Sequence, residues 1–216
     1  GAYVRGSITS HLDLIGRFAR VSGGRALALD YRLAPEHPFP AGLDDATAAW
    51  RWLLAQGVAP EQVVLAGDSA GGGLALAALL QWKDEQLPLP AGAVLLSPWT
   101  DLTFSGASIV EKATVDPMLT LDNLSDCASK YLAQTPPSDP LASPLFADLS
   151  GLPPLQVLVG EAEILLDDSL RLVARARAAG TSVELERWPE MPHVWPAFAS
   201  ALPEGREAIT RIGAFM

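Results

Sequence analysis

The sequence predicts an α/β fold in which a mostly parallel sheet is flanked by helices. Short apolar runs typical of buried strands alternate along the chain with longer stretches typical of helices. Of the 216 residues, 49% are hydrophobic, which is enough to build one good core. Length and composition together favour a single domain over residues 1–216.

Each expected strand is a short apolar or alternating run bounded by turn residues. In chain order these runs are Ala26–Asp30, Val63–Gly67, Ala93–Ser97, Leu155–Gly160 and Val183–Trp188. The expected helices lie between and around them, at Ser10–Val21, Asp44–Gln56, Ser69–Glu85, Asp168–Ala179 and Glu204–Phe215. In the expected helix Asp44–Gln56, the acidic Asp44 suits the first turn, and Gly57 suits the position just after the last residue.

A long insertion, residues 101–149, interrupts this alternation and is rich in Ser, Pro and Asp. Its best helical stretch runs from Asp122 to Leu132 and contains the only cysteine, Cys127, which we expect to be a small packing residue. Long excursions of this kind are commonly lids or binding elements. We therefore expect residues 101–149 to contribute to a cap, with a loosely packed surface excursion as the alternative.

Charge and composition exclude several classes of partner. A formal net charge of −10 argues against nucleic-acid and anionic-membrane partners. The longest apolar run, Leu74–Leu80, is too short to cross a bilayer, so we expect no membrane insertion. Metal-ligand spacing is absent and no secretion signal is recognisable. We expect a cytoplasmic protein that acts on a small molecule, and a homodimer is compatible with the sequence.

The most informative motif is Gly67-Asp68-Ser69-Ala70-Gly71, which lies between a predicted strand and a predicted helix. Small flanking residues allow a tight turn that lifts the serine hydroxyl above the sheet. The helix that follows directs free N–H groups to the same point, where negative charge develops in acyl transfer. This arrangement predicts a nucleophile elbow with Ser69 as the nucleophile.

A serine nucleophile requires a base, and the chain has 3 histidines. We expect His11 to be a solvated residue of an amphipathic helix and His37 to have a structural role in a proline-rich turn. His193 lies in a loop after the last predicted strand and is the only histidine after Ser69. The chain order serine, acid, histidine of elbow hydrolases therefore favours His193 as the base.

The acid is expected after the strand Leu155–Gly160, where the chain offers the carboxylates of Glu161, Glu163, Asp167 and Asp168. Asp167 and Asp168 fall where a helix begins, so N-terminal capping is their ordinary role. Glu161 and Glu163 lie in the loop itself, nearer the strand end. Motif chemistry alone does not choose between these two.

Four motifs in this chain resemble those of the bacterial hormone-sensitive-lipase family of carboxylesterases. In order, they are YRLAPEHPFPA at 31–41, GDSAGG at 67–72, LSPWTDL at 96–102 and PEMPH at 189–193. The resemblance implies an α/β-hydrolase fold, a Ser–acid–His triad, no cofactor, and hydrolysis of short- to medium-chain acyl esters through an acyl-enzyme intermediate. It places the acid at Glu163, with Asp167 as a second candidate.

The resemblance extends to the family's oxyanion loop, whose tail is similar to residues 1–3. By that match, the backbone N–H groups of Gly1, Ala2 and Ala70 would hold the oxyanion. The insertion would contribute to the family's cap over the active site. Candidates to line the acyl pocket are Phe104, Met118, Leu119 and Trp195, with core packing as an equal alternative for Trp195.

By the same resemblance, the chain begins just after a strand that normally lies between Ala26–Asp30 and Val63–Gly67. We therefore expect an N-terminally truncated hydrolase domain whose 216 residues alone are poorly folded or inactive. The alternatives to an active esterase are a non-catalytic binding protein on the same scaffold and an inert fragment. Plant gibberellin receptors resemble this family but lack the catalytic histidine, so the presence of His193 favours an enzyme.

Overall fold

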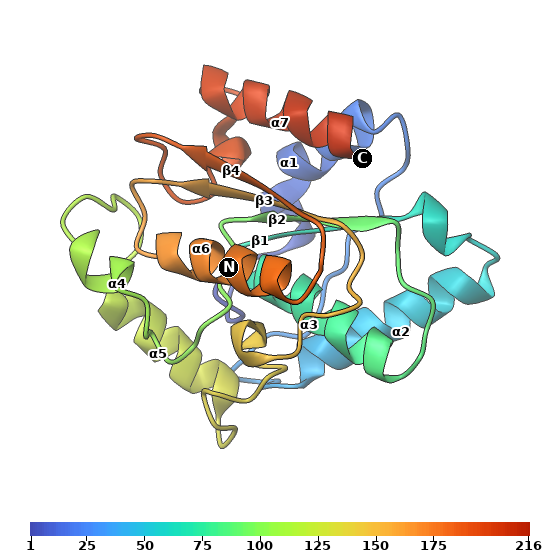
Figure 1. The fold of residues 1–216 in the computed structure, drawn as a ribbon, viewed down its shortest axis with the longest axis horizontal. Helices are drawn as coiled ribbons and strands as arrows, with labels where there is room; N and C mark the ends of the chain where they lie inside the picture. The colour runs from blue at the N-terminus through green and yellow to red at the C-terminus, as the bar shows by residue number, and fades with distance from the viewer.

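The computed structural model describes residues 1–216 and contains one parallel sheet of four strands. These are β1 (Val64–Asp68), β2 (Gly92–Leu96), β3 (Leu155–Gly160) and β4 (Val183–Trp188), which are neighbours in chain order (Figure 1). The register aligns Asp68 with Leu96 and Gly160 with Trp188, so the carboxyl ends of the strands lie along one edge. The predicted α/β class is confirmed, and these strands lie within one residue of their expected bounds.

Helices cover both faces of the sheet (Figure 1). One face carries α1 (Ile8–Val21) and α7 (Pro203–Phe215), which pack against each other; the other carries α3 (Ala70–Asp84) and α6 (Leu166–Ala178), with α2 (Ala41–Ala55) packed on α3. Short 3-10 turns are η1 (Pro60–Gln62) and η3 (Trp195–Phe198). Because both faces are covered, β2 and β3 are buried along their whole length. None of the helices combines the length and apolarity that crossing a bilayer requires.

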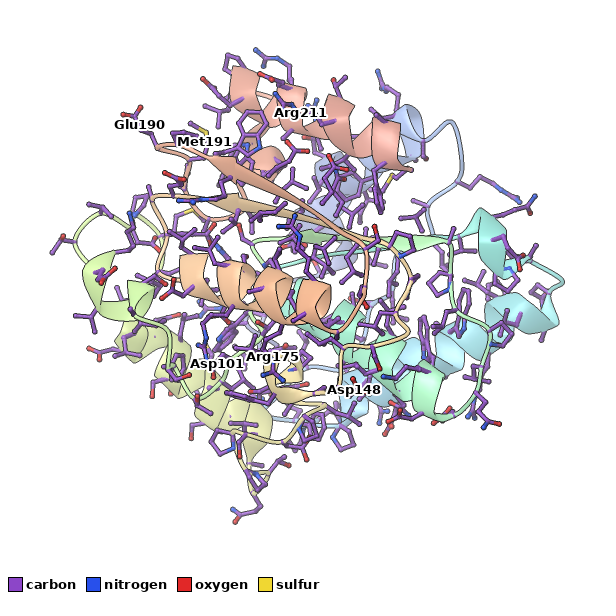
Figure 2. The ribbon with its side chains drawn as sticks, in the orientation of Figure 1. Asp101, Asp148, Arg175, Glu190, Met191 and Arg211 are labelled. Carbon is purple, nitrogen blue, oxygen red and sulfur yellow. The ribbon has the colours of Figure 1, made fainter.

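The insertion after β2 forms α4 (Ser108–Glu111), α5 (Leu121–Leu132) and η2 (Pro144–Phe146). Leu124, Cys127 and Tyr131 of α5 are buried in the main hydrophobic cluster. At the start of the insertion, the carboxylate of Asp101 accepts a hydrogen bond at 2.8 Å from Arg171 of α6, the helix beside Asp101 in Figure 2. The insertion is therefore packed against the domain rather than loosely attached, and its function as a cap stays a prediction.

The expected strand Ala26–Asp30 is not formed. Its backbone belongs to no hydrogen-bonded ladder, and the side chains of Leu27 and Leu29 are 56% and 39% exposed. β1 pairs with β2 on one side and has no partner strand on the other. The apolar pattern predicted a strand here, but a strand needs a neighbour with which to exchange hydrogen bonds, and this segment has none.

Candidate active site

Ser69 lies on a sharp turn between β1 and α3, as the elbow motif predicts. Its backbone has φ +54° and ψ −120°, a region that costs a non-glycine residue on the order of 1–3 kcal/mol. Backbone bonds hold the turn: Ser69 N donates to Leu96 O at 2.8 Å, and Trp99 N donates to Ser69 O at 2.9 Å. A Cβ on Gly67 would overlap the backbone of Gly71, which explains the glycine at that position.

A buried pair joins His193, in the loop after β4, to Glu163, in the loop after β3. His193 Nδ1 lies 2.6 Å from Glu163 Oε2. Glu163 is fully buried, and only 4% of His193 is exposed. A carboxylate so placed orients the imidazole and stabilises the positive charge that the ring gains when it accepts a proton. Glu190 and Met191, just before the histidine, lie at the end of β4 in Figure 2, which places the pair at the carboxyl edge of the sheet.

The other acid candidates bind elsewhere. Glu161 Oε1 forms an ion pair with Arg187 Nη2 at 2.8 Å. Asp167 lies in the first turn of α6, as expected, but its Oδ2 accepts the backbone N–H of Ser108 at 3.0 Å. Glu163 is thus the carboxylate of this loop that the structure brings to His193.

No hydrogen bond joins Ser69 Oγ to the ring of His193 in this structure, and Ser69 is 8% exposed. Catalytic hydrogen bonds are often long in the absence of substrate and shorten when the substrate binds. The elbow follows β1 and is bonded to the end of β2, whereas the two members of the buried pair lie in the loops after β3 and β4.

The carboxylate beside the nucleophile, Asp68, pairs with a histidine from α1. His11 Nε2 lies 3.4 Å from Asp68 Oδ2. Burial opposes ionisation of Asp68, but the hydrogen bond and charge of His11 and the charge of His193 bring the pKa of this carboxyl below its ordinary value. The same hydrogen bond raises the pKa of His11. His11 lies in α1, as expected, and 33% of its side chain is exposed, but it also has an acidic partner that helix periodicity does not reveal because Asp68 lies far away in sequence.

A serine after β2 was missed as a site residue by sequence reasoning. Ser97 Oγ donates to Glu163 Oε1 at 2.7 Å and is fully buried. The available signal was its place in the LSPWTDL motif, directly after a buried strand. Spacing alone could not find it, because Ser97 and Glu163 are 66 residues apart.

The expected oxyanion donors come from two segments, the start of α3 and the N-terminal turn. Ala70 is the first residue of α3 and is fully buried; the first N–H groups of a helix have no acceptor within the helix. Ala2 is 7% exposed and has φ +53°. The next residue, Tyr3, stacks on Tyr131 with ring centroids 3.8 Å apart, which anchors the N-terminal turn to α5. The amine of Gly1 contacts the carbonyl of Arg5. The use of Gly1, Ala2 and Ala70 as oxyanion donors stays a prediction.

The candidate pocket residues fall in different environments. Phe104 packs partly buried against Trp99, with ring centroids 6.0 Å apart. Leu119 is partly buried against the main core, and Met118 is 48% exposed. Trp195 is fully buried in the cluster under α1 and α7, where its ring centroid lies 5.4 Å from that of Trp188. This position corresponds to the core-packing alternative for Trp195 and not to a pocket wall.

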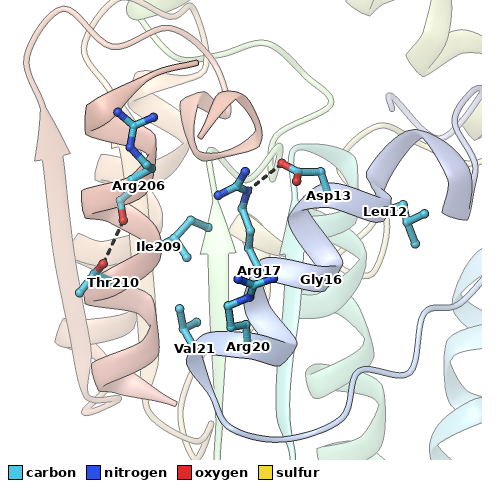
Figure 3. A pocket seen from close by; sticks show the side chains of 9 residues that line it. All are labelled: Leu12, Asp13, Gly16, Arg17, Arg20, Val21, Arg206, Ile209 and Thr210. Atoms are coloured by element: carbon cyan, nitrogen blue, oxygen red, sulfur yellow. Dashed lines mark hydrogen bonds and ion pairs between the residues drawn. The ribbon is translucent and has the colours of Figure 1, made fainter. Parts of the chain in front are cut away.

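A groove between α1 and α7 is separate from this site (Figure 3). Its lining includes Arg17, Arg20 and Arg206, and Arg17 Nε donates to Asp13 at 2.7 Å. None of the expected catalytic, oxyanion or pocket residues lines this groove.

The fold and the elbow together define the class of protein. A family profile described as alpha/beta hydrolase fold matches residues 1–197. The chain belongs to that family.

Relatives narrow the identification. An acetyl-hydrolase of Streptomyces hygroscopicus is 50% identical over 216 residues, which are 100% of this chain and 72% of that protein. A crystal structure of an esterase from the bacterial hormone-sensitive lipase family is 52% identical, with a TM-score of 0.98 over 100% of this chain and 72% of that one. A crystal structure of EstE5 soaked with p-nitrophenyl butyrate is 50% identical, with a TM-score of 0.97 and the same coverage. The protein is thus a carboxylic ester hydrolase of the hormone-sensitive-lipase type, as the motifs predict.

Proposed function

We propose that the protein hydrolyses short- to medium-chain acyl esters by a serine mechanism with an acyl-enzyme intermediate. The observation that carries this proposal is the buried Glu163–His193 pair, 2.6 Å apart, at the sheet edge that also bears the strained elbow of Ser69. A serine hydroxyl is a weak nucleophile until a base held by a third group removes its proton. This chain supplies all three groups in the chain order typical of elbow hydrolases.

In the first step, Ser69 Oγ attacks the ester carbonyl while His193 takes the hydroxyl proton. Glu163 stabilises the imidazolium, and His193 then gives the proton to the departing alcohol. In the second step, water attacks the acyl-enzyme with His193 again acting as base, which releases the acid and restores Ser69. Backbone donors at Gly1, Ala2 and Ala70 would stabilise the oxyanion of both steps, each worth roughly 3 to 4 kcal/mol.

Two relatives and the insertion support a small acyl group. One relative is named an acetyl-hydrolase, and the EstE5 crystals were soaked with a butyrate ester. Phe104, Met118 and Leu119 lie in the insertion and would line a small acyl pocket. A non-catalytic binding function is disfavoured because a buried, paired His193 has no evident use without a serine to deprotonate.

Ser69→Ala tests this proposal in a polypeptide that contains residues 1–216 and in which esterase activity is first established. Turnover of p-nitrophenyl butyrate should fall to background, because no other group can form the acyl-enzyme. A fluorophosphonate should label Ser69 and should not label the Ser69→Ala variant.

Ser169→Ala is the matched control. Ser169 is fully buried and its hydroxyl has no hydrogen-bond partner, so its removal should change neither turnover nor labelling. Label on a serine other than Ser69, or full turnover by Ser69→Ala, would contradict the proposed mechanism.

A further inference from the structure

Ser97, the residue after β2, contacts both loops that form the buried pair. Its Oγ donates a hydrogen bond to Glu163 Oε1 at 2.7 Å and accepts one from the backbone N–H of Val194 at 3.1 Å. Val194 directly follows His193. One buried hydroxyl therefore links the loop of the acid to the loop of the base.

The bond from Val194 fixes the direction of the Ser97 hydroxyl. A hydroxyl has a single proton to donate, and a backbone N–H can only donate. Ser97 Oγ must therefore accept from Val194, and its proton is available for Glu163. Oε1 of Glu163 also accepts the backbone N–H of Gly160 at 2.9 Å. With two donors on Oε1, the other oxygen, Oε2, faces His193.

The two residues joined by this bond both have strained backbones. Ser97 has φ +45° and Val194 has φ +52°. Positive φ is uncommon for residues with a Cβ and is an outlier for a β-branched residue such as valine. Glycine at position 97 would suit the backbone but would remove the hydroxyl. The strained serine is therefore explained by what its side chain bonds to.

We propose that Ser97 is a positioning residue that holds Glu163 in the orientation His193 needs, a role that rests on the serine mechanism proposed above. Without the hydroxyl, Oε1 keeps only the Gly160 bond and the carboxylate can rotate away from Nδ1. The imidazole is then held less firmly in the orientation that receives the Ser69 proton. Because Ser97 is fully buried, it acts on the chemical step and not on substrate binding.

Ser97→Ala tests this role in a polypeptide that contains residues 1–216 and hydrolyses p-nitrophenyl butyrate. We expect kcat to fall about 10- to 100-fold while KM changes less than about twofold. Ser97→Gly lacks the same hydroxyl but suits the positive φ, so it should show the same loss of kcat whatever its unfolding temperature. Either variant with the parent kcat, or a loss confined to KM, would overturn the proposal.

A double-mutant cycle separates positioning from packing. In a Glu163→Gln background the carboxylate is gone, so adding Ser97→Ala should change kcat by less than about threefold. A loss in that background as large as in the parent would mean that Ser97 supports only the packing, and would overturn the proposal. The serine mechanism is tested separately by Ser69→Ala. An inactive Ser69→Ala variant beside a fully active Ser97→Ala variant would reject the positioning role alone.

Discussion

The two halves of the sheet support the candidate site in different ways. β2 and β3 are buried throughout, and Glu163, in the loop after β3, is held by hydrogen bonds with Ser97, Gly160 and His193. β1, which leads to Ser69, is only partly buried and pairs with one neighbour. The acid–base pair is thus positioned by the core, whereas the nucleophile lies at the end of a strand with an open edge.

The site requires both a fixed nucleophile and a fixed acid–base pair, and different parts of the fold support them. The elbow is anchored from the β2 side, through the Ser69–Leu96 bond and the close approach of Gly72 to Pro98. No strand pairs with β1 along its other edge, and residues 25–33 add none. A substitution at the acid–base pair can therefore change the geometry of the pair and leave the β1 edge as it is. A substitution near the β1 edge can likewise leave the pair unchanged.

The largest effect is expected in the buried half. Glu163→Gln should lower kcat by about 10³- to 10⁴-fold with little change in folding, because the amide cannot stabilise an imidazolium or fix its tautomer. Steady-state kinetics with p-nitrophenyl butyrate and the unfolding temperature measure the two effects.

Asp167→Asn is the matched control, since Asp167 is a neighbouring carboxylate that binds Ser108 and not His193. Asp167→Asn should lower kcat by about tenfold or less, as expected when a charge at a helix terminus is removed. The reverse ranking of these variants in kcat would identify Asp167 as the acid.

The sequence alone predicts part of this site but not all of it. Local patterns predicted the elbow at Ser69 and the strands of the buried sheet, because both depend on neighbours in sequence. Choosing Glu163 over Glu161 required the family resemblance, because both follow the same strand. Ser97 and its bond to Val194 could not be predicted, since these residues are 97 positions apart and meet only through the order of the strands.

The second prediction concerns the open half. Purified as these 216 residues alone, the protein should unfold with a free energy below about 5 kcal/mol, self-associate with rising concentration, and show little esterase activity. The cause is the unpaired edge of β1, which exposes backbone donors and acceptors for pairing with another chain. Chemical denaturation, light scattering and ester hydrolysis measure the three properties.

Leu27→Lys combined with Leu29→Lys distinguishes the effect of the unpaired β1 edge from the effect of these two exposed leucine side chains. These substitutions should improve solubility without raising the unfolding free energy, because they leave the β1 edge unpaired. Cooperative unfolding together with robust activity of the unmodified chain would show that the open edge is harmless.

A third prediction concerns the contact between α6 and the start of the insertion. Asp168 is 1% exposed, and its Oδ2 accepts the N–H groups of Thr100 and Asp101 at 2.7 and 2.8 Å. Burial, reinforced by the charge of Asp101 and opposed by the hydrogen bonds, raises the pKa of Asp168 from 3.8 to about 8. Between these pH values the folded protein holds a proton that the unfolded chain has released. The unfolding free energy should therefore fall as pH rises through this window.

Asp168→Asn resembles the protonated side chain and removes its titration. The parent should lose about 1 kcal/mol more per pH unit than the variant between about pH 4 and pH 8. Denaturant titrations across this range give the two slopes. Parallel slopes would mean that Asp168 is ionised in the folded protein.

The smallest effect is expected in the insertion, which belongs to neither half of the sheet. Met118 of the insertion is 48% exposed, which we expect to leave room for small acyl groups, so kcat/KM on p-nitrophenyl esters should peak at short chains. Met118→Ala should lower kcat/KM for the hexanoate by about tenfold or less and leave the acetate nearly unchanged, because each buried methylene contributes only about 0.8 kcal/mol. Val110→Ala, in the same insertion and 78% exposed, should change neither. If long-chain emulsified triglycerides are preferred instead, the pocket extends beyond these residues and the insertion must open at a lipid surface.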